Sequence, residues 1–397
     1  MSLSFRAMAK STSAPPNCVS IVTFVGSIRV TGLTPFVALP LMRRFRFLAA
    51  ALFLLNCLAR VESLVAALAK PANFDEQTVA NFYRGKVVRI VVGFPPGGGA
   101  DVYSRLIARH LGRFVPGNPT LAVANMPGAG SIIAGNHIFN SGARDGSEIG
   151  MLNGAVILEQ LFANPGVHFD MAKFRYLAVP VNETYVMIVA RQSGITKFSD
   201  LVGSNAKHLT LGAIPNSTLE HAPILLRDAL NANLKIVSGY KGSADIRLAI
   251  DSGEIGGFFN PWSTVKPSSL DKFKIGDWSV IAQLADQPLA DLPVHNIPTI
   301  PELTKDENQR LLLRYGTSAP NQFGKVYMLP LGVAADRAAA LEAAFAKTLT
   351  DKSFLAEAEK GKLEITPIFG ESIHKIVRDF LAMPPAIKAR LEKALKR

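Results

Sequence analysis

Two glycine-rich loops carry the strongest chemical signal in this sequence. The first follows an apolar run at residues 87–92, and its candidate ligand-binding residues are Phe94, Pro96, Gly97, Gly98, Gly99, Ala100 and Asp101. The second follows a run at residues 121–124 and supplies Gly128, Ala129, Gly130 and Ser131. Because glycine has no Cβ, backbone N–H groups can approach a ligand closely, and the helix N-terminus after each loop favours an anion. We predict that the two loops share one carboxylate group; the alternative is that both are simply tight βα turns.

The spacing of these glycines excludes the common nucleotide-binding loops. A P-loop needs Gly followed by Lys and Ser or Thr, whereas Ala100 and Asp101 follow Gly99. A dinucleotide-binding loop needs a further glycine three residues after its second, whereas Ser, Ile and Ile follow Gly130. We therefore expect no nucleotide and no other cofactor.

Polar residues further along the chain are candidates for a second set of ligand contacts: Asn216, Ser217, Thr218, Tyr240, Lys241 and Asn260. The first three begin a predicted helix, where they bind the far end of an elongated acid or simply cap the helix. Tyr240 and Lys241 follow a short strand, and a cation there suits an anionic ligand, although an exposed lysine is usually solvated. Asn260 is a candidate polar anchor within an aromatic stretch that core packing explains equally well.

No arrangement of side chains predicts catalysis or a metal site. Asp101, near a helix start, is most simply an N-cap or a partner of the helix dipole. His221 lies four residues after Ser217, but the G-x-S-x-G turn of hydrolases is absent. The other histidines form no H-E-x-x-H motif or close ligand pair, and His110 is best explained as a core residue. We predict no catalytic residue and no metal ligand.

The length and the charge distribution indicate two globular units and no nucleic-acid partner. The chain has 397 residues and a formal net charge of +12. Residues 1–69 hold seven Arg or Lys residues against one acid, Glu62, and the remaining excess is spread thinly. Because no basic stripe with interleaved aromatics is present, the charge does not predict nucleic-acid binding.

Residues 42–69 have the pattern of a secretory signal peptide. Three arginines, at positions 43, 44 and 46, precede an apolar run at residues 47–59, which is shorter than the ~20 residues that cross a bilayer. Because such signals begin a chain, we predict that Met42 is the true start and that residues 1–41 are an artefact of an earlier start codon. A genuine extension with a signal anchor is the alternative. Both cysteines, Cys18 and Cys57, lie in this part, so we expect a mature protein without thiols.

Strand and helix patterns alternate along the rest of the chain. Apolar runs predict strands at 87–92, 121–124 and 149–152, with helices after the two glycine loops. Further strands are predicted near 185–190, 209–212, 235–237 and 254–258, with helices that start near Ser199, Ser217 and Ser243. The chain is expected to return after residues 278–285, through a proline-rich linker. Apolar stripes at 341–349 and 373–381 predict C-terminal helices. Open α/β sheets of this kind bind ligands at the carboxyl ends of their strands.

Four stretches carry a family resemblance: VRIVVGFPPGGGADVYSRLIARHL, VANMPGAGSIIAGN, SGYKGSADIRLAIDSGEIGGFF and NIPTIPEL. In order and spacing, over about residues 85–385, the chain resembles the extracytoplasmic receptors of tripartite tricarboxylate transporters, the Bug family. The resemblance implies an α/β, two-lobed type II periplasmic-binding-protein fold with a hinge and an interlobe ligand cleft. We expect lobe 1 at residues 85–183 and 291–397, and lobe 2 at residues 184–290.

The resemblance also implies a function. A Bug-type receptor holds one carboxylate of a small organic acid with its two glycine loops, here Phe94–Asp101 and Gly128–Ser131, and its second-lobe loop, here Asn216–Thr218, sets specificity. It is a periplasmic, non-enzymatic monomer that delivers the acid to integral membrane permease subunits. The alternative is an exported α/β enzyme acting on a small carboxylate or phosphate compound.

The chain departs from the family pattern at residues 284–299 and 311–330. These departures place the docking surface and the family-typical ligand in question more than the fold.

Overall fold

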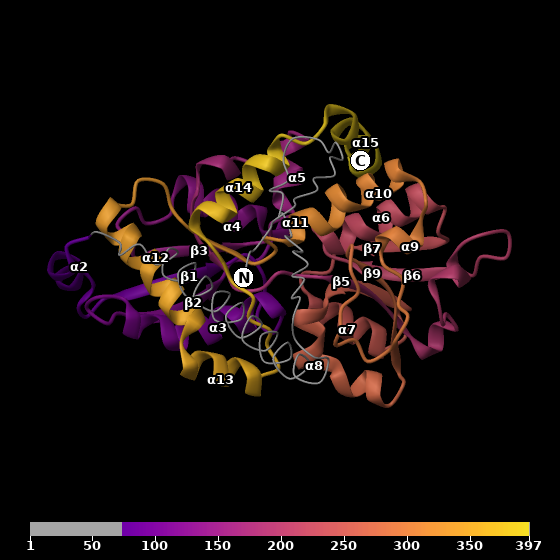
Figure 1. Cartoon of the computed structure of the whole chain (residues 1–397), viewed down its shortest axis with the longest axis horizontal. Helices are drawn as coiled ribbons and strands as arrows, with labels where there is room; N and C mark the ends of the chain where they lie inside the picture. Colours follow the sequence, from indigo (N-terminus) through magenta and orange to yellow (C-terminus); the bar gives the residue numbers. More distant parts are fainter. Residues whose placement is uncertain (1–73, 397) are drawn as a thin grey trace, which may run out of the picture. The chain divides into compact units, whose positions relative to one another are not determined.

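A computed structural model describes residues 74–396, which belong to one compact unit of the chain, Pro71–Arg397 (Figure 1). The predictions for residues 1–41, residues 42–69 and the two cysteines lie outside the described residues. Within residues 74–396, no helix combines the length and the apolar character that crossing a membrane requires.

The first sheet has six strands in the order β11-β4-β10-β3-β1-β2. Strand β1 forms readily because its sequence is almost wholly β-branched, and Ile90 and Val92 are fully buried. It pairs in parallel with β2 and β3, while β10 runs antiparallel between β3 and β4. The strands are β1 Val87–Val92, β2 Thr120–Asn125, β3 Glu148–Leu152, β4 Arg175–Val179, β10 Val326–Leu329 and β11 Ile368–Phe369.

The second sheet has five strands in the order β7-β6-β8-β5-β9. Strand β6 pairs in parallel with β7 and β8, and β5 pairs antiparallel with β8 and β9. Strand β5, which lies between β8 and β9, is buried along its whole length. The strands are β5 Tyr185–Ala190, β6 Leu209–Ala213, β7 Leu234–Ser238, β8 Gly257–Pro261 and β9 Trp278–Leu284.

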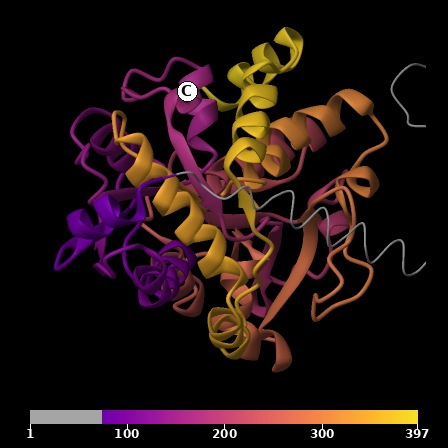
Figure 2. The same ribbon diagram turned by 60° about the vertical axis from the view of Figure 1, so that its left-hand side comes forward.

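Helices cover the first sheet and complete what we call the first lobe. Helix α3 packs on β1 and β2, α4 packs on β3, and α12 and α14 pack on β4. Helix α12, in orange, lies across this sheet in both views (Figures 1 and 2). The helices of this part are α2 Glu76–Tyr83, α3 Gly99–Leu111, α4 Ile132–Asn140, α5 Val156–Leu161, α12 Ala335–Thr350, α13 Lys352–Lys360 and α14 Gly370–Leu381.

A second group of helices packs on the second sheet and completes the second lobe. Helix α6 packs on β6, β7 and β8, and α10 and α15 pack on α6. The predicted boundary at residue 291 assigns α10 and α15 to the first lobe, whereas these contacts are with the second. The helices are α6 Thr218–Leu230, α7 Ser243–Asp251, α8 Trp262–Lys274, α9 Ile300–Leu303, α10 Glu307–Leu313, α11 Ala319–Asn321 and α15 Pro385–Leu395.

The chain passes between the two sheets at two neighbouring points. Residues 180–184 connect β4 to β5, and residues 322–325 connect α11 to β10. The Glu183 N–H donates to the Asn321 carbonyl at 3.4 Å, so the two connections lie side by side. We call them the two crossings.

The two α/β sheets confirm the predicted fold class, and the strands near the glycine loops lie where the apolar runs predict them. The prediction of a helix from Ser199 is wrong: Phe198–Leu201 is a single 3₁₀ turn, followed within two residues by Gly203 at φ +90°. The strand expected near 254–258 begins at Gly257, because Gly253, at φ +80°, and the residues after it still form the turn behind α7. The sequence patterns did not predict β10.

The packing of α12 on the first sheet predicts a large difference between two leucine substitutions. Leu341, in α12, is fully buried, whereas Leu355, in α13, is 38% exposed. We expect Leu341→Ala to lower the free energy of unfolding by about 2–5 kcal/mol, because it leaves a core cavity. Leu355→Ala, the control, should lower it by about 1 kcal/mol or less. Urea denaturation followed by circular dichroism measures both, and equal losses would contradict this packing.

Candidate functional site

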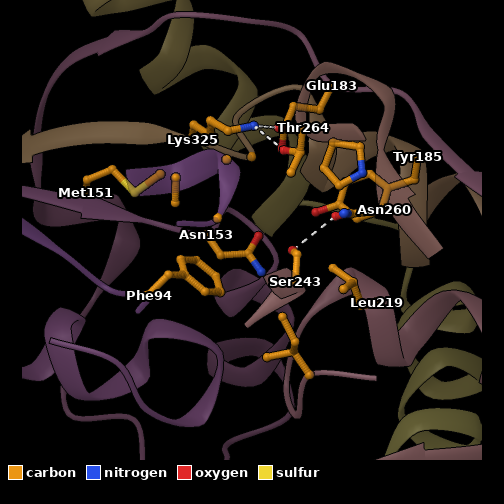
Figure 3. Close-up of a pocket in the computed structure, with 16 residues that line it drawn as sticks. Phe94, Met151, Asn153, Glu183, Tyr185, Leu219, Ser243, Asn260, Thr264 and Lys325 are labelled. Atoms are coloured by element: carbon orange, nitrogen blue, oxygen red, sulfur yellow. Dashed lines mark hydrogen bonds and ion pairs between the residues drawn. The ribbon is translucent and has the colours of Figure 1, made fainter. Parts of the chain in front are cut away.

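A small cavity lies between the two lobes, beside the crossings (Figure 3). Its volume is about 50 Å³. Four helices contribute residues from their starts to its wall: Gly98, Gly99 and Ala100 from α3, Leu219 from α6, Ser243 from α7 and Thr264 from α8. The first N–H groups of a helix have no acceptor within the helix and carry partial positive charge. The cavity wall is therefore suited to an anion.

The start of α3 is fixed by Asp101, whose side chain points away from solvent and is 3% exposed. Its carboxylate accepts hydrogen bonds from Gly97 N at 3.0 Å, Arg105 Nε at 2.9 Å and Asn125 Nδ2 at 3.0 Å. Burial raises the pKa of Asp101, but the hydrogen bonds from Arg105, Gly97 and Asn125 outweigh it and hold the pKa below its usual value. This carboxylate shapes the glycine loop rather than facing the cavity.

Asn260, at the end of β8, lines the cavity with an unused donor. The residue is 1% exposed, and its Oδ1 accepts from Ser243 Oγ at 3.3 Å, as Figure 3 shows. Its Nδ2 has no hydrogen-bond partner among the described residues. A buried N–H without an acceptor costs about 1–3 kcal/mol, so the site favours a ligand that carries an acceptor.

A buried ion pair joins the two crossings at the cavity wall. Lys325 Nζ contacts Glu183 Oε1, and Ser263 Oγ donates to the same oxygen at 3.2 Å. The side chains of Lys325 and Glu183 are 4% and 2% exposed. Burial disfavours the ammonium and lowers the pKa of Lys325, while the carboxylate in contact with it favours the charged form. The pair therefore places both signs of charge at one side of the cavity.

The remaining wall is largely apolar and suits a carbon skeleton. Phe94, Met151 and Tyr185 face the cavity, together with Ile214 and Leu219 (Figure 3). Most of a small-molecule site is apolar in this way, with a few polar groups that fix the ligand's orientation.

The two lobes contact each other around the cavity. A Cβ on Gly99 would lie 2.0 Å from Thr264 Oγ1 of the second lobe, so only glycine permits this approach. A Cβ on Gly130 would lie 2.5 Å from the Asn216 carbonyl oxygen. Arg247 Nη2 of α7 donates to the Gly97 carbonyl at 3.4 Å. The described conformation is therefore one in which the lobes are closed on each other.

Five of the predicted ligand-binding residues meet at this cavity: Phe94, Gly98, Gly99, Ala100 and Asn260. The other members of the first loop, Pro96, Gly97 and Asp101, lie outside its lining. Pro96 and Gly97 are exposed, and Asp101 is bound within its own loop.

The second glycine loop, residues 128–131, is also outside the cavity lining. Gly130 packs against the second lobe, as described above. Gly128 would meet Ile133 if it carried a Cβ, and Ala129 is exposed with φ +46°. The Ser131 side chain is buried and accepts from the Asn153 N–H at 3.0 Å. This loop contacts the other lobe instead of lining the cavity with the first loop.

The predicted second-lobe contacts, apart from Asn260, lie outside the cavity lining. Asn216 N donates to Glu220 Oε2, Ser217 Oγ donates to the Ile214 carbonyl, and Thr218 Oγ1 donates to Asn321 Oδ1. Tyr240 OH donates to Glu254 Oε1, and burial together with this carboxylate raises the pKa of Tyr240 to about 12. Lys241 is exposed.

Sequence reasoning missed the ion pair of the cavity wall and the polar residues Asn153, Ser243 and Thr264. Glu183 and Lys325 are far apart in the chain, and no local pattern marks either. Ser243 could have been predicted as a site residue, because the sequence places it at a helix start. Helix starts of parallel α/β units gather at one edge of the sheet, where ligands bind. Within residues 74–396, no cluster of three or more His, Cys, Asp or Glu residues is suited to hold a metal ion.

Three solved structures resemble this one over nearly their whole length. The periplasmic binding protein BugD is 19% identical, with a TM-score of 0.63, and the match covers 79% of this chain and 98% of that chain. The R. palustris protein Rpa4515 with adipate is 18% identical, with a TM-score of 0.62, and the match covers 78% of this chain and 98% of that chain. This chain has the periplasmic-binding-protein fold.

The third similar structure is that of MatC from Rhodopseudomonas palustris with bound malate. It is 16% identical, with a TM-score of 0.59, and the match covers 78% of this chain and 99% of that chain. The two-lobed fold expected from the sequence is thereby confirmed. No protein-family model matches the sequence, and no curated protein matches it.

The network around Asp101 predicts a pH-dependent contribution to stability. Because its pKa is lowered in the folded state, this contribution is present above the unfolded value of about 3.9 and is lost as pH falls through the folded value. We expect Asp101→Asn to lower the free energy of unfolding by about 1–3 kcal/mol at pH 7, from the lost charged hydrogen bonds. The loss should shrink as pH falls below about 4.

Urea denaturation across this pH range measures the effect. The matched control is Asp271→Asn, because the Asp271 side chain is 87% exposed. A loss at Asp101 that stays constant with pH, or one no larger than that at Asp271, would contradict the role given to this network.

Proposed function

We propose that this chain is an extracytoplasmic solute receptor of the Bug type. It captures a small carboxylic acid between its two lobes and delivers the acid to the permease subunits of a tripartite tricarboxylate-type membrane transporter. The observation that carries the proposal is the interlobe cavity, which is lined by the first residues of α3 and by Asn260, whose buried Nδ2 has no hydrogen-bond partner among the described residues.

The similar structures support this proposal without assigning a ligand. MatC was solved with bound malate and Rpa4515 with adipate, and both of these compounds are carboxylic acids. The glycine loop, the chemistry of the cavity and the two-lobed fold are all consistent with an acid of this kind.

The small volume of the cavity supports capture by closure. About 50 Å³ holds only a few waters, since each needs about 10–15 Å³, so a multi-carbon acid enters only when the lobes separate. The bound acid then stabilises the closed state because it contacts both lobes, which an acid bound by one lobe alone does not do. The closed form is the signal that a permease recognises.

A non-enzymatic, periplasmic role fits the same observations. Asp101, the one candidate base within the glycine loops, is bound by Arg105, Gly97 and Asn125 and leaves no carboxylate there for chemistry. Residues 42–69 supply the export signal in this proposal, and the receptor acts as a monomer.

Removing the free donor in the cavity should weaken ligand binding. We expect Asn260→Ala to reduce the affinity for a cognate acid about ten- to hundredfold, because it removes a buried hydrogen bond to a charged group. Lys241→Ala is the control and should leave the affinity nearly unchanged, since Lys241 is exposed. Cognate acids are first found by thermal shift against a panel of mono- and dicarboxylates, and isothermal titration calorimetry then measures each variant. Equal affinities for wild type and Asn260→Ala would contradict the proposed site.

Adjacent glycines provide a test of closure. A Cβ on Gly99 meets Thr264 across the cleft, whereas a Cβ on Gly98 has no atom within 4 Å. We expect Gly99→Ala to bind the acid more weakly than Gly98→Ala and to remain open in its presence. Small-angle X-ray scattering with and without the acid measures the change in radius of gyration. A Gly99→Ala protein that compacts as fully as Gly98→Ala would refute closure at this contact.

A further inference from the structure

Glu183 and Lys325 are the charged side chains in the lining of the interlobe cavity, among the described residues. Figure 3 shows them together on one side of the cavity, while Phe94 and Ser243 lie on the opposite side. Their charges are opposite, so the side chains of the wall carry no net charge.

Lys325 is fully engaged where it lies. Its Nζ contacts Glu183, lies 3.4 Å from Ser263 Oγ and 3.5 Å from Thr264 Oγ1, and sits 4.9 Å from the centre of the Tyr103 ring. Glu183 Oε2 lies directly against Gly324, where an added Cβ would come within 2.2 Å of it. Separating the pair would leave two buried charges without partners, which is strongly unfavourable.

We propose that the Glu183–Lys325 pair makes the receptor selective for acids with a single carboxylate and an uncharged or hydrogen-bond-donating remainder. This inference rests on the proposed function. The single carboxylate lies against the start of α3 and Asn260, and the remainder of the acid faces the ion pair. A second carboxylate would have to lie beside Glu183, whose charge repels it, while the ammonium that would attract it is already neutralised.

The test compares each dicarboxylate with its own monoamide, which has nearly the same shape and one charge less. Isothermal titration calorimetry on the wild-type protein uses succinate, glutarate, adipate and terephthalate against their monoamides. We expect the monoamide of the best-fitting pair to bind at least about tenfold more tightly than the diacid. Diacids that bind as tightly as their monoamides, or more tightly, would overturn the inference and leave the proposed function standing. Absence of binding by every acid of a broad mono- and dicarboxylate panel would overturn the proposed function, and the inference with it.

Substitution of the pair tests the cause of the selectivity. Glu183→Gln removes the repelling charge, so the ratio of monoamide to diacid affinity should fall at least about tenfold. The double variant Glu183→Gln/Lys325→Met leaves no charged side chain in the cavity wall and should also lose the selectivity while it still binds the monoamide. It replaces the single variant if Glu183→Gln does not fold, which thermal unfolding reports. Unchanged selectivity in the folded variant would assign the discrimination to shape and contradict the inference.

Discussion

The unpaired backbone amides at the start of α3 set what this molecule can hold. They are positioned by β1, which delivers the chain to the edge of the first sheet, and by Asp101, which ties the glycine loop to Arg105 and Asn125. Because Gly99 has no Cβ, it lies directly against Thr264 of the second lobe. In the proposed function the same helix terminus also binds the carboxylate, so binding and closure depend on the same few residues.

The two crossings explain why the side of the cavity away from α3 carries a charged pair. The connection between β4 and β5 brings Glu183, and the connection to β10 brings Lys325, so that the pair forms only when both lobes are folded and the crossings are adjacent. Lys325 comes from residues 311–330, a stretch in which the sequence departs from the Bug pattern.

Local sequence patterns were sufficient for β1, β2 and β3 and for the glycine loop before α3, but they did not predict β4. There the β-branched run, the loop and the amphipathic helix all act within about twenty residues, as a βα unit requires. Strand β10 and the ion pair escaped prediction because both depend on partners distant in the chain: β10 is inserted antiparallel between β3 and β4. The second glycine loop has the composition of a ligand loop, but its backbone approaches Pro215 and Asn216, and only the relative placement of the lobes shows this. Asn260 was found from its polar character in an aromatic strand, whereas its unpaired Nδ2 is visible only in three dimensions.

The central claim is that a ligand carboxylate lies against the amides at the start of α3. Nuclear magnetic resonance of protein labelled with ¹⁵N-glycine measures this directly during titration with a bound acid. The account predicts that the Gly99 amide proton moves downfield and saturates with the calorimetric affinity, because it gains a hydrogen bond to a charged oxygen. A Gly99 amide signal that stays in place while the acid saturates the protein would contradict the account.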